Sequence, residues 1–573
     1  MKIKIREPQL LTFEEFENLS IEDKLLILPL MPPKKRFDFL TDSKDAIALV
    51  RASPVIDLMV TIKEIGLDGA GPLLALCNSE QLQYFLDMDA WSGYSFDKEK
   101  MHRYLMILRE WDIDVFKDKF CGLDYEQQLI YLLGDFKVFL VRDDFDPDEG
   151  APENSFTIDG MYYLQPLCDE EKFLLTKELL MLVFENDKDL YLRLVEGMRQ
   201  ELYSVLEDEL YRFRNSRITE LGFYEYDDAI GVYSEPTNIK RTIIPSRIDE
   251  FSYSRLPIRY IHDIEPIKSE LELIDERCAM EILFELQVLV NRLIIADKLE
   301  MFEIESLETS SKKVKSLLRL GLDVIKSELN IEPLQAVKQF YVIDIFRHGY
   351  KKLKSLRDEA KRIKSIHQYL KFVELPPYFE VLMKITQKNF VEINMREIFS
   401  DATSEYPESL VEIQKLQDLL LELEASLDIL IKCYEVRIED IEQFDHTHTN
   451  IPSDSKPPLY NLLMTPIINS FLGHGLRFVP IEKMDIISVY KKIFVESRGE
   501  ILLSDEFLKS IEENIFLKLK ESSNRYLYAR RIIGRVLEEF ISELGHIQDI
   551  HQLNPDFISV ITIKKKRFLL TIE

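Results

Sequence analysis

A short pattern recurs in the first third of the chain, where helical segments are expected to begin. It reads Leu-x-x-Glu-x-x-Leu, or a near variant that can end in Phe, and an apolar run follows it. The later three copies are separated by about the 40–47 residues of a HEAT-like two-helix repeat. Because stacked helix pairs build surfaces for partners, the pattern favours binding over catalysis. The four copies contain Leu19, Glu22 and Leu25; Leu76, Glu80 and Leu82; Leu123, Glu126 and Leu129; and Leu167, Glu170 and Phe173.

The composition favours a packed, mainly helical protein. Hydrophobic residues make up 46% of the chain, which is enough for a packed interior, and only 18 glycines occur among abundant Leu, Ile, Glu and Lys. A chain of 573 residues is too long for one ordinary core, because single cores stop growing at about 250–300 residues. We therefore expect about two to four domains or a repeat array.

The chain carries a formal net charge of −29 at pH 7. An acidic surface repels phosphate backbones and anionic membranes, so we expect no nucleic-acid partner. The same charge also keeps a protein soluble, and by itself it identifies no binding site.

Several features predict a cytoplasmic protein. The five cysteines lie far apart without a C-x-x-C motif, which argues against a disulfide framework and a cysteine-based zinc site. The N-terminal sequence becomes charged too early for the apolar core of a signal peptide. Residues 459–476 form the longest weakly charged stretch, which falls short of a span of about 20 residues. We therefore expect no membrane span.

Hydrophobic periodicity and turn residues predict a mainly α fold. It consists of a short HEAT-like helical array with an inserted small β-sheet, followed by a region of long helices. The six predicted segments are 1–135, a helical-repeat region; 136–166, a small β insertion; 167–233, a helical continuation; 234–266, a proline-bearing connector; 267–445, a region of long helices; and 446–573, a C-terminal helical region with a terminal β-hairpin.

The β insertion has two signals. Lys137–Arg142 is rich in β-branched and aromatic residues, which is typical of a strand. Ser155–Gln165 contains Asp159 and Gly160 at its centre, the residue pair that favours a type I′ hairpin turn. Together they predict a small three-stranded sheet.

Motifs for nucleotide, acyl-transfer, kinase and zinc-protease chemistry are missing from the sequence, so we expect no cofactor. The most metal-like feature is the loop that contains His446 and His448. Alternate residues on an extended segment point the same way, so these two imidazoles are able to approach one ion. No third ligand lies near them in the sequence, and the alternative is a solvated polar loop.

Two groups of basic residues are candidate contacts for an anion or an acidic partner. Arg214 and Arg217 precede Gly222, a candidate helix end, and the alternative is that they stabilise the C-terminus of their own helix. The second group forms a positive face at helical spacing, and the alternative is pairing with acidic helices of the same chain. This second group consists of Lys354, Arg357, Lys361 and Lys364.

Four segments carry a resemblance: Ile62–Leu76, Glu80–Trp91, Phe156–Leu164 and Arg214–Ile230. Together they resemble an uncharacterised bacterial family, a domain of unknown function associated mainly with anaerobes of the delta-proteobacterial type. The resemblance covers roughly residues 45–235. It implies no established activity, so it carries over no catalytic residue. The leucine-rich repeats are also similar to the cytoplasmic helical domain of MgtE-type magnesium transporters, which implies repeat geometry only.

The sequence therefore favours a non-enzymatic cytoplasmic module, either for protein interaction or with a scaffold or regulatory role, that binds one or more protein partners. Two alternatives stay open. One is a metal-assisted hydrolase that uses His446, His448 and carboxylates. The other is a sensor of small anions whose site is not visible as a motif.

Overall fold

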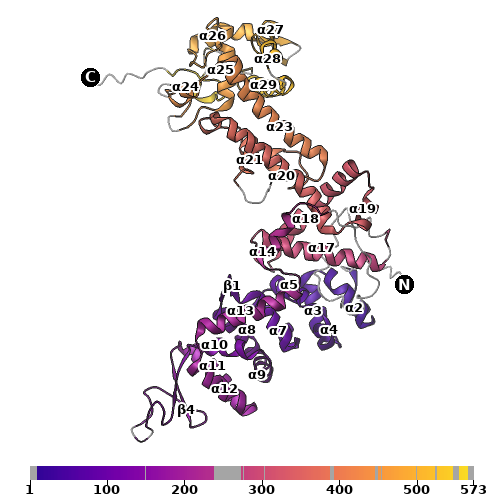
Figure 1. The fold of residues 1–573 in the computed structure, drawn as a ribbon, viewed down its shortest axis with the longest axis vertical. Helices are drawn as coiled ribbons and strands as arrows, with labels where there is room; N and C mark the ends of the chain where they lie inside the picture. Colours follow the sequence, from indigo (N-terminus) through magenta and orange to yellow (C-terminus); the bar gives the residue numbers. More distant parts are fainter. Residues whose placement is uncertain are drawn as a thin grey trace, which may run out of the picture. The chain divides into compact units, whose positions relative to one another are not determined.

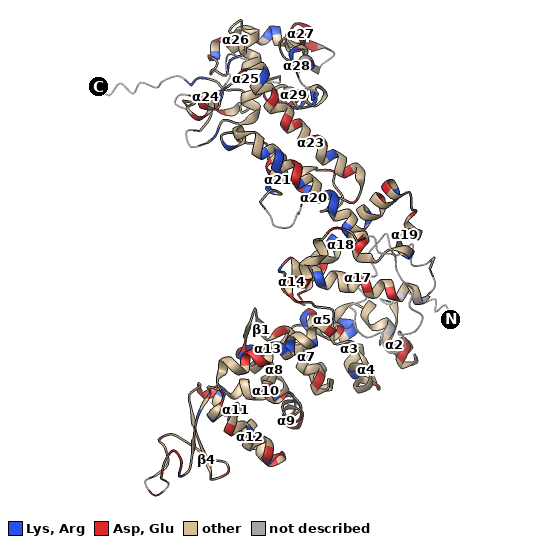
Figure 2. Ribbon diagram, in the orientation of Figure 1, with Lys and Arg blue, Asp and Glu red and all other residues tan. Residues whose placement is uncertain are grey.

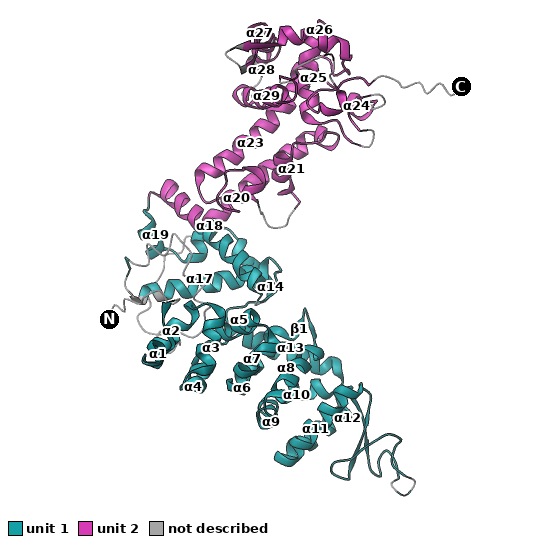
Figure 3. Cartoon of the chain, turned by 180° about the vertical axis from the view of Figure 1, so that it is seen from behind, with its two compact units in different colours: residues 1–318, 331–347 teal, residues 319–330, 348–573 magenta. Residues whose placement is uncertain are grey.

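The chain forms two compact units of mainly α-helical structure, which confirms the predicted fold class (Figure 1). The first unit comprises residues 1–318 and 331–347, and the second comprises residues 319–330 and 348–573 (Figure 3). The division into six segments stays a prediction. The computed structural model describes residues 10–146, 148, 150–237, 273–274, 276–301, 303–387, 393–445, 449–452, 455–497, 500–522, 525–545, 547, 551 and 554–565.

The first unit consists largely of short helices joined by short loops. Its strands are β1 (Trp91–Ser92), β2 (Ser95–Phe96), β3 (Phe136–Leu140) and β4 (Tyr162–Pro166). Its helices are α1 (Phe13–Glu17), α2 (Ile21–Ile27), α3 (Pro33–Asp42), α4 (Ala46–Ala52), α5 (Val55–Ile65), α6 (Gly71–Leu76), α7 (Ser79–Asp89), α8 (Lys98–Trp111), α9 (Ile113–Cys121), α10 (Tyr125–Leu132), α11 (Glu170–Asn186), α12 (Lys188–Gln200), α13 (Tyr203–Glu220), α14 (Tyr226–Ala229), α17 (Glu276–Ala296) and α19 (Pro333–Gln339).

The second unit combines parts of two long helices with helices and strands of its own. Helices α18 (Ile304–Leu329) and α20 (Val342–Ile366) contribute residues to both units. The other α-helices and strands described in this unit are α21 (Pro377–Lys384), α22 (Met395–Ile398), α23 (Leu410–Asp428), α24 (Ile438–Glu442), α25 (Leu459–Phe471), α26 (Lys483–Ile493), β5 (Phe494–Ser497), β6 (Glu500–Leu503), α27 (Asp505–Ile511), α28 (Leu517–Ser522) and α29 (Tyr526–Phe540).

The Leu-x-x-Glu pattern marks helix starts. Its four glutamates lie in the first turns of α2, α7, α10 and α11, where a negative charge is favoured by the helix dipole. Side chains such as Asn78 and Asp169 cap two of these helices by accepting backbone hydrogen bonds. Because α7 and α10 are separated by two helices whereas α11 is the next helix after α10, the copies do not occupy equivalent places. A regular repeat therefore stays a prediction.

The β insertion contains the predicted strand, but the turn at Asp159 differs from the prediction. Strands β3 and β4 pair antiparallel, with Leu140 opposite Tyr162. Phe156 makes only a single bridge, to Leu164, so the third predicted strand is reduced to one residue. The type I′ prediction is wrong, because Gly160 alone of the two turn residues has a positive φ. The carboxylate of Asp159 instead accepts hydrogen bonds from the backbone N–H groups of Met161 and Tyr162. The side chain of Asp159 therefore stabilises this turn.

The end of the described chain packs within the second unit. Ile563 bridges Ile481 in parallel, and Lys564 bridges Thr449 in antiparallel orientation. Asn450 fastens this segment by donating to the backbone oxygens of Ile558 and Ile561. Residues 566–573, which contain the second strand of the predicted terminal hairpin, lie outside the described residues, as do residues 238–266 of the predicted connector.

Candidate binding cleft on the first unit

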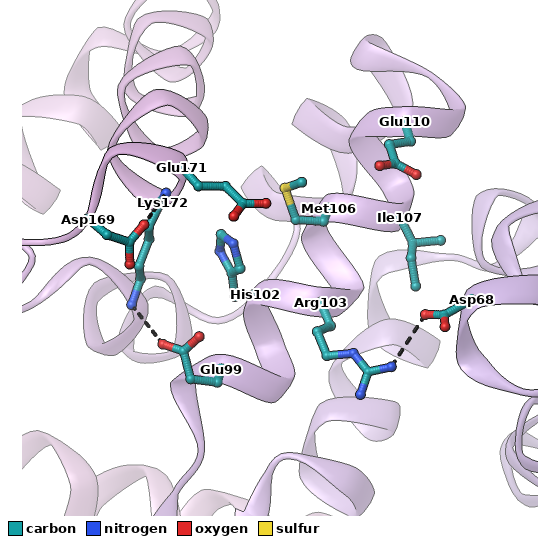
Figure 4. A pocket seen from close by; sticks show the side chains of 10 residues that line it. All are labelled: Asp68, Glu99, His102, Arg103, Met106, Ile107, Glu110, Asp169, Glu171 and Lys172. Atoms are coloured by element: carbon teal, nitrogen blue, oxygen red, sulfur yellow. Dashed lines mark hydrogen bonds and ion pairs between the residues drawn. The ribbon is translucent and has the colours of Figure 1, made fainter.

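One face of α8 lines a cleft of about 370 Å³. The opposite face of this helix is buried and includes Met101, Tyr104, Leu105 and Leu108. Helical periodicity therefore leaves the cleft face exposed to solvent. The loop between α5 and α6 and the first turn of α11 complete the walls (Figure 4). The acidic cleft, as we call it, is lined by Asp68, Glu99, His102, Arg103, Met106, Ile107, Glu110, Asp169, Glu171 and Lys172.

The lining combines negative charge with an apolar strip. Its five carboxylates outnumber its two permanent cations, Arg103 and Lys172. Met106 and Ile107 supply the apolar part, and Trp111 continues it one turn after Ile107, with 54% of its surface exposed. A Cβ atom at Gly71 would lie 3.5 Å from the side chains of both Ile107 and Trp111, so α6 supports this strip from beneath.

The only histidine of the acidic cleft is held by a buried tyrosine. His102 Nδ1 lies 2.8 Å from the hydroxyl oxygen of Tyr131. Burial raises the pKa of Tyr131 well above its ordinary value, so this hydroxyl keeps its proton. Burial also lowers the pKa of His102. A neutral imidazole that accepts a hydrogen bond from the tyrosine hydroxyl at Nδ1 carries its own proton on Nε2.

An ion-pair chain fixes the start of α11 against α8. Lys172 Nζ lies 3.4 Å from Glu99 Oε1 and 3.4 Å from Asp135 Oδ2. Lys98 Nζ lies 2.8 Å from the other oxygen of Asp135 and donates to the backbone carbonyl of Leu133. Burial lowers the pKa of Lys98. These contacts give one wall of the acidic cleft a fixed position.

A second cavity of about 250 Å³ adjoins α8. Lys63, Lys100 and Arg103 line it with a single carboxylate, Asp89, and we call it the cationic pocket. Lys63 Nζ lies 2.7 Å from Asp89 Oδ1, and the hydroxyl of Tyr104 donates to Asp89 Oδ2 at 3.1 Å. Arg103 lines both cavities.

The predicted arginines Arg214 and Arg217 lie on α13 and reach α7. Arg217 makes a two-pronged pair with Asp87, with its Nε 2.5 Å from Oδ2 and its Nη2 3.0 Å from Oδ1. It also donates to Asp124 at 2.7 Å. Arg214 donates to the backbone carbonyl of Asp87 and lies over the ring of Trp91. Both arginines therefore fasten α13 to α7, and their contact with an external anion stays a prediction.

The predicted basic face lies on the part of α20 that belongs to the second unit. Lys354 is half-buried and Lys361 is exposed. Arg357 Nε lies 3.5 Å from Asp358 Oδ1, and Lys364 donates to Thr386 at 3.4 Å. Contact of this face with an external partner stays a prediction.

One ion pair on this stretch of α20 involves a residue that was not a candidate in the sequence analysis. Arg362 donates two hydrogen bonds to the buried carboxylate of Glu424 on α23, at 2.9 and 2.8 Å. Arg525 adds a third contact at 2.7 Å. Figure 2 shows basic residues of α20 and acidic residues of α23 in this region. Burial opposes the charged form, but the bond from Arg362 and the charge of Arg525 hold the pKa of Glu424 below its ordinary value.

The metal candidates His446 and His448 lie outside the described residues. In the part of the chain that is described, no three His, Cys, Asp or Glu side chains are grouped as a metal ion requires. No helix in that part combines the length and the hydrophobicity needed to cross a membrane.

Sequence reasoning missed the acidic cleft, because its walls come from three separate segments. A signal was present on α8, where Glu99, His102, Met106 and Glu110 repeat at helical spacing opposite the apolar face. That spacing identifies an exposed face, but it does not show which other segments meet it.

The fold and the cleft define a mainly helical protein with a mixed polar and apolar groove. A model described as "Family of unknown function (DUF6178)" matches residues 14–564. The chain belongs to this family, which confirms the predicted resemblance and extends it beyond residues 45–235. The bacterial origin stays a prediction. Neither the curated proteins nor the solved structures provide a match to the chain.

Proposed function

We propose that this protein is a non-enzymatic interaction module, which binds a basic and partly apolar segment of a partner protein in the acidic cleft. The observation that carries the proposal is the combination of five carboxylates with the half-buried Met106 and Ile107 around one cavity, beside the exposed Trp111 one turn farther along α8. The carboxylates attract Lys or Arg side chains. Met106, Ile107 and Trp111 offer apolar contact to neighbouring residues of the same segment.

Trp111 strengthens the match to a basic segment. Its exposed indole ring lies one turn beyond Ile107, next to Glu110 in the sequence. A Lys or Arg side chain is attracted by the face of an indole ring as well as by carboxylates. Aromatic anchors beside apolar contacts also dominate the binding energy in many protein interfaces. A small anion gains from none of these features, which favours a basic peptide over an anion in this cavity.

The test is a selection from a random peptide library displayed on phage, performed against the full chain. The wild type should enrich peptides that combine Lys or Arg with apolar residues. The double variant Glu110→Lys, Glu171→Gln should lose the basic enrichment. Both positions are exposed, and lysine near the C-terminus of α8 is compatible with the helix dipole, so we expect the variant to fold.

The matched control changes the same charges elsewhere on the array. Glu185→Lys with Asp189→Asn alters two exposed residues outside the acidic cleft and produces the same change in net charge. The control should select the same basic peptides as the wild type. The proposal is wrong if the wild type shows no basic enrichment, or if the control loses that enrichment to the same extent as the cleft variant.

A further inference from the structure

We infer that the bound segment also carries an acidic side chain, which enters the cationic pocket next to the acidic cleft. The partner would then present a basic and an acidic residue close together. This inference rests on the proposed function and specifies the chemistry of its ligand.

The two cavities have opposite charge. The acidic cleft has more carboxylates than cations, whereas Lys63, Lys100 and Arg103 outnumber Asp89 in the cationic pocket. Lys63 already shares its charge between Asp89 and Glu303, at 2.7 Å from each. Lys100 lies farther from Asp89, at 3.8 Å. Because both lysines are already paired with Asp89, we expect a ligand carboxylate to bind mainly to Arg103.

The geometry of α8 places the two cavities side by side. Lys100 and Tyr104 are one turn apart and line the cationic pocket, whereas Met106 and Glu110 are one turn apart and line the acidic cleft. Arg103 falls between these two stripes of the helix surface, which agrees with its place in both linings. A peptide that crosses α8 at this point therefore meets both cavities.

The ion pair between Arg103 and Asp68 is weak enough for a ligand carboxylate to replace Asp68. Arg103 Nη2 lies 3.3 Å from Asp68 Oδ1, and the two side chains are 61% and 86% exposed. An exposed pair of this kind contributes little to stability, so it rearranges readily. A ligand carboxylate can replace Asp68 on Arg103, and the released Asp68 then faces the basic residue of the same ligand in the acidic cleft.

The first test uses the peptides that the wild-type chain selects. They should show an acidic residue at a fixed distance in sequence from the basic one. Selection against Arg103→Gln should keep the basic preference and lose the acidic one. The control is Arg109→Gln on the same helix, because Arg109 pairs with Glu178 and lines neither cavity; this variant should keep both preferences.

The second test is a double-mutant cycle with two synthetic peptides of the selected consensus, one with Glu and one with Gln at the acidic position. Wild type should bind the Glu peptide about fivefold more tightly, whereas Arg103→Gln should bind both with equal affinity. Basic enrichment without an acidic preference would overturn this inference and leave the proposed function intact. An acidic preference that survives in Arg103→Gln would overturn it as well.

Discussion

Asp57 is a carboxylic acid buried in α5, with an exposed fraction of 6%. Its Oδ2 atom has no hydrogen-bond partner within the described residues. Burial raises the pKa of Asp57 to about 8, although the nearby Arg36 favours the charged form. Arg36 is itself paired with Glu64. The fold therefore holds Asp57 in its neutral form at neutral pH.

The raised pKa of Asp57 makes the stability of the fold fall as the pH rises. The folded chain binds the Asp57 proton more tightly than the unfolded chain, whose pKa is about 4. Stabilisation by the neutral form is therefore complete below about pH 4, and it is lost as the pH rises to about 8, by up to about 1.4 kcal/mol per pH unit. The free energy of unfolding of Asp57→Asn should fall less steeply than that of wild type between about pH 5 and 8 in urea titrations. Equal slopes for the two proteins would show that Asp57 ionises freely in the folded chain.

Glu424 represents the opposite case, a buried carboxylate that stays charged. It accepts hydrogen bonds from Arg362 and forms an ion pair with Arg525. Replacing it with Ala removes the partner of the partly exposed Arg362, whereas Arg525 keeps its pair with Asp428, so we expect a loss of about 1–3 kcal/mol in the free energy of unfolding. The exposed Glu439 on α24 is a control whose replacement with Ala should change stability by less than about 0.5 kcal/mol. Comparable losses in both variants would contradict the role of the Arg362–Glu424–Arg525 network.

At the scale of elements, one glycine sets the distance between α10 and α12. A Cβ atom at Gly197 would lie 2.6 Å from the hydroxyl of Tyr125 and 2.8 Å from Leu129. Gly197→Ala should therefore destabilise the chain by about 1–3 kcal/mol, because overpacking outweighs the gain in helix propensity. In α29, a Cβ atom at Gly534 would meet nothing within 4 Å, so Gly534→Ala should stabilise its helix by about 0.5–1 kcal/mol. Calorimetric unfolding of both variants measures the difference, and two changes of the same sign would contradict it.

Local chemistry is the part of this fold that can be predicted from the sequence. The glutamates of the Leu-x-x-Glu pattern lie in first helical turns because charge and side-chain capping act within one turn, as at α7 and α11. The turn at Asp159 was predicted incorrectly because its carboxylate bonds to the backbone in a way that competes with the type I′ turn.

The acidic cleft and the arginine contacts depend on tertiary packing, so local sequence patterns do not predict them. Arg217 and Asp87 are separated by 130 residues yet form a two-pronged pair. Asp68, Glu110 and Glu171 face one cavity although they lie on three different segments. No periodicity in one segment shows which distant segment it will meet, so the sequence identified these basic residues but not their partners.

For the whole molecule, the net charge of −29 adds a long-range attraction for any basic segment. Salt screens this attraction over about 10 Å at 0.1 M. We expect the dissociation constant of a selected basic peptide to rise about tenfold between about 0.05 and 0.5 M NaCl. The rise should be smaller for the Glu110→Lys, Glu171→Gln variant. Fluorescence anisotropy measures it, and an affinity independent of salt would contradict charge recognition.

The most direct test of binding in the acidic cleft is site-specific photocrosslinking. A benzoylphenylalanine replaces Ile107 in the cleft in one protein, and in the control it replaces Leu192, a partly exposed apolar residue on α12. Each protein is irradiated with the basic peptide that wild type selects. The account predicts a covalent peptide adduct at position 107 and little or none at position 192. Equal labelling at the two positions, or labelling at 192 alone, would contradict it.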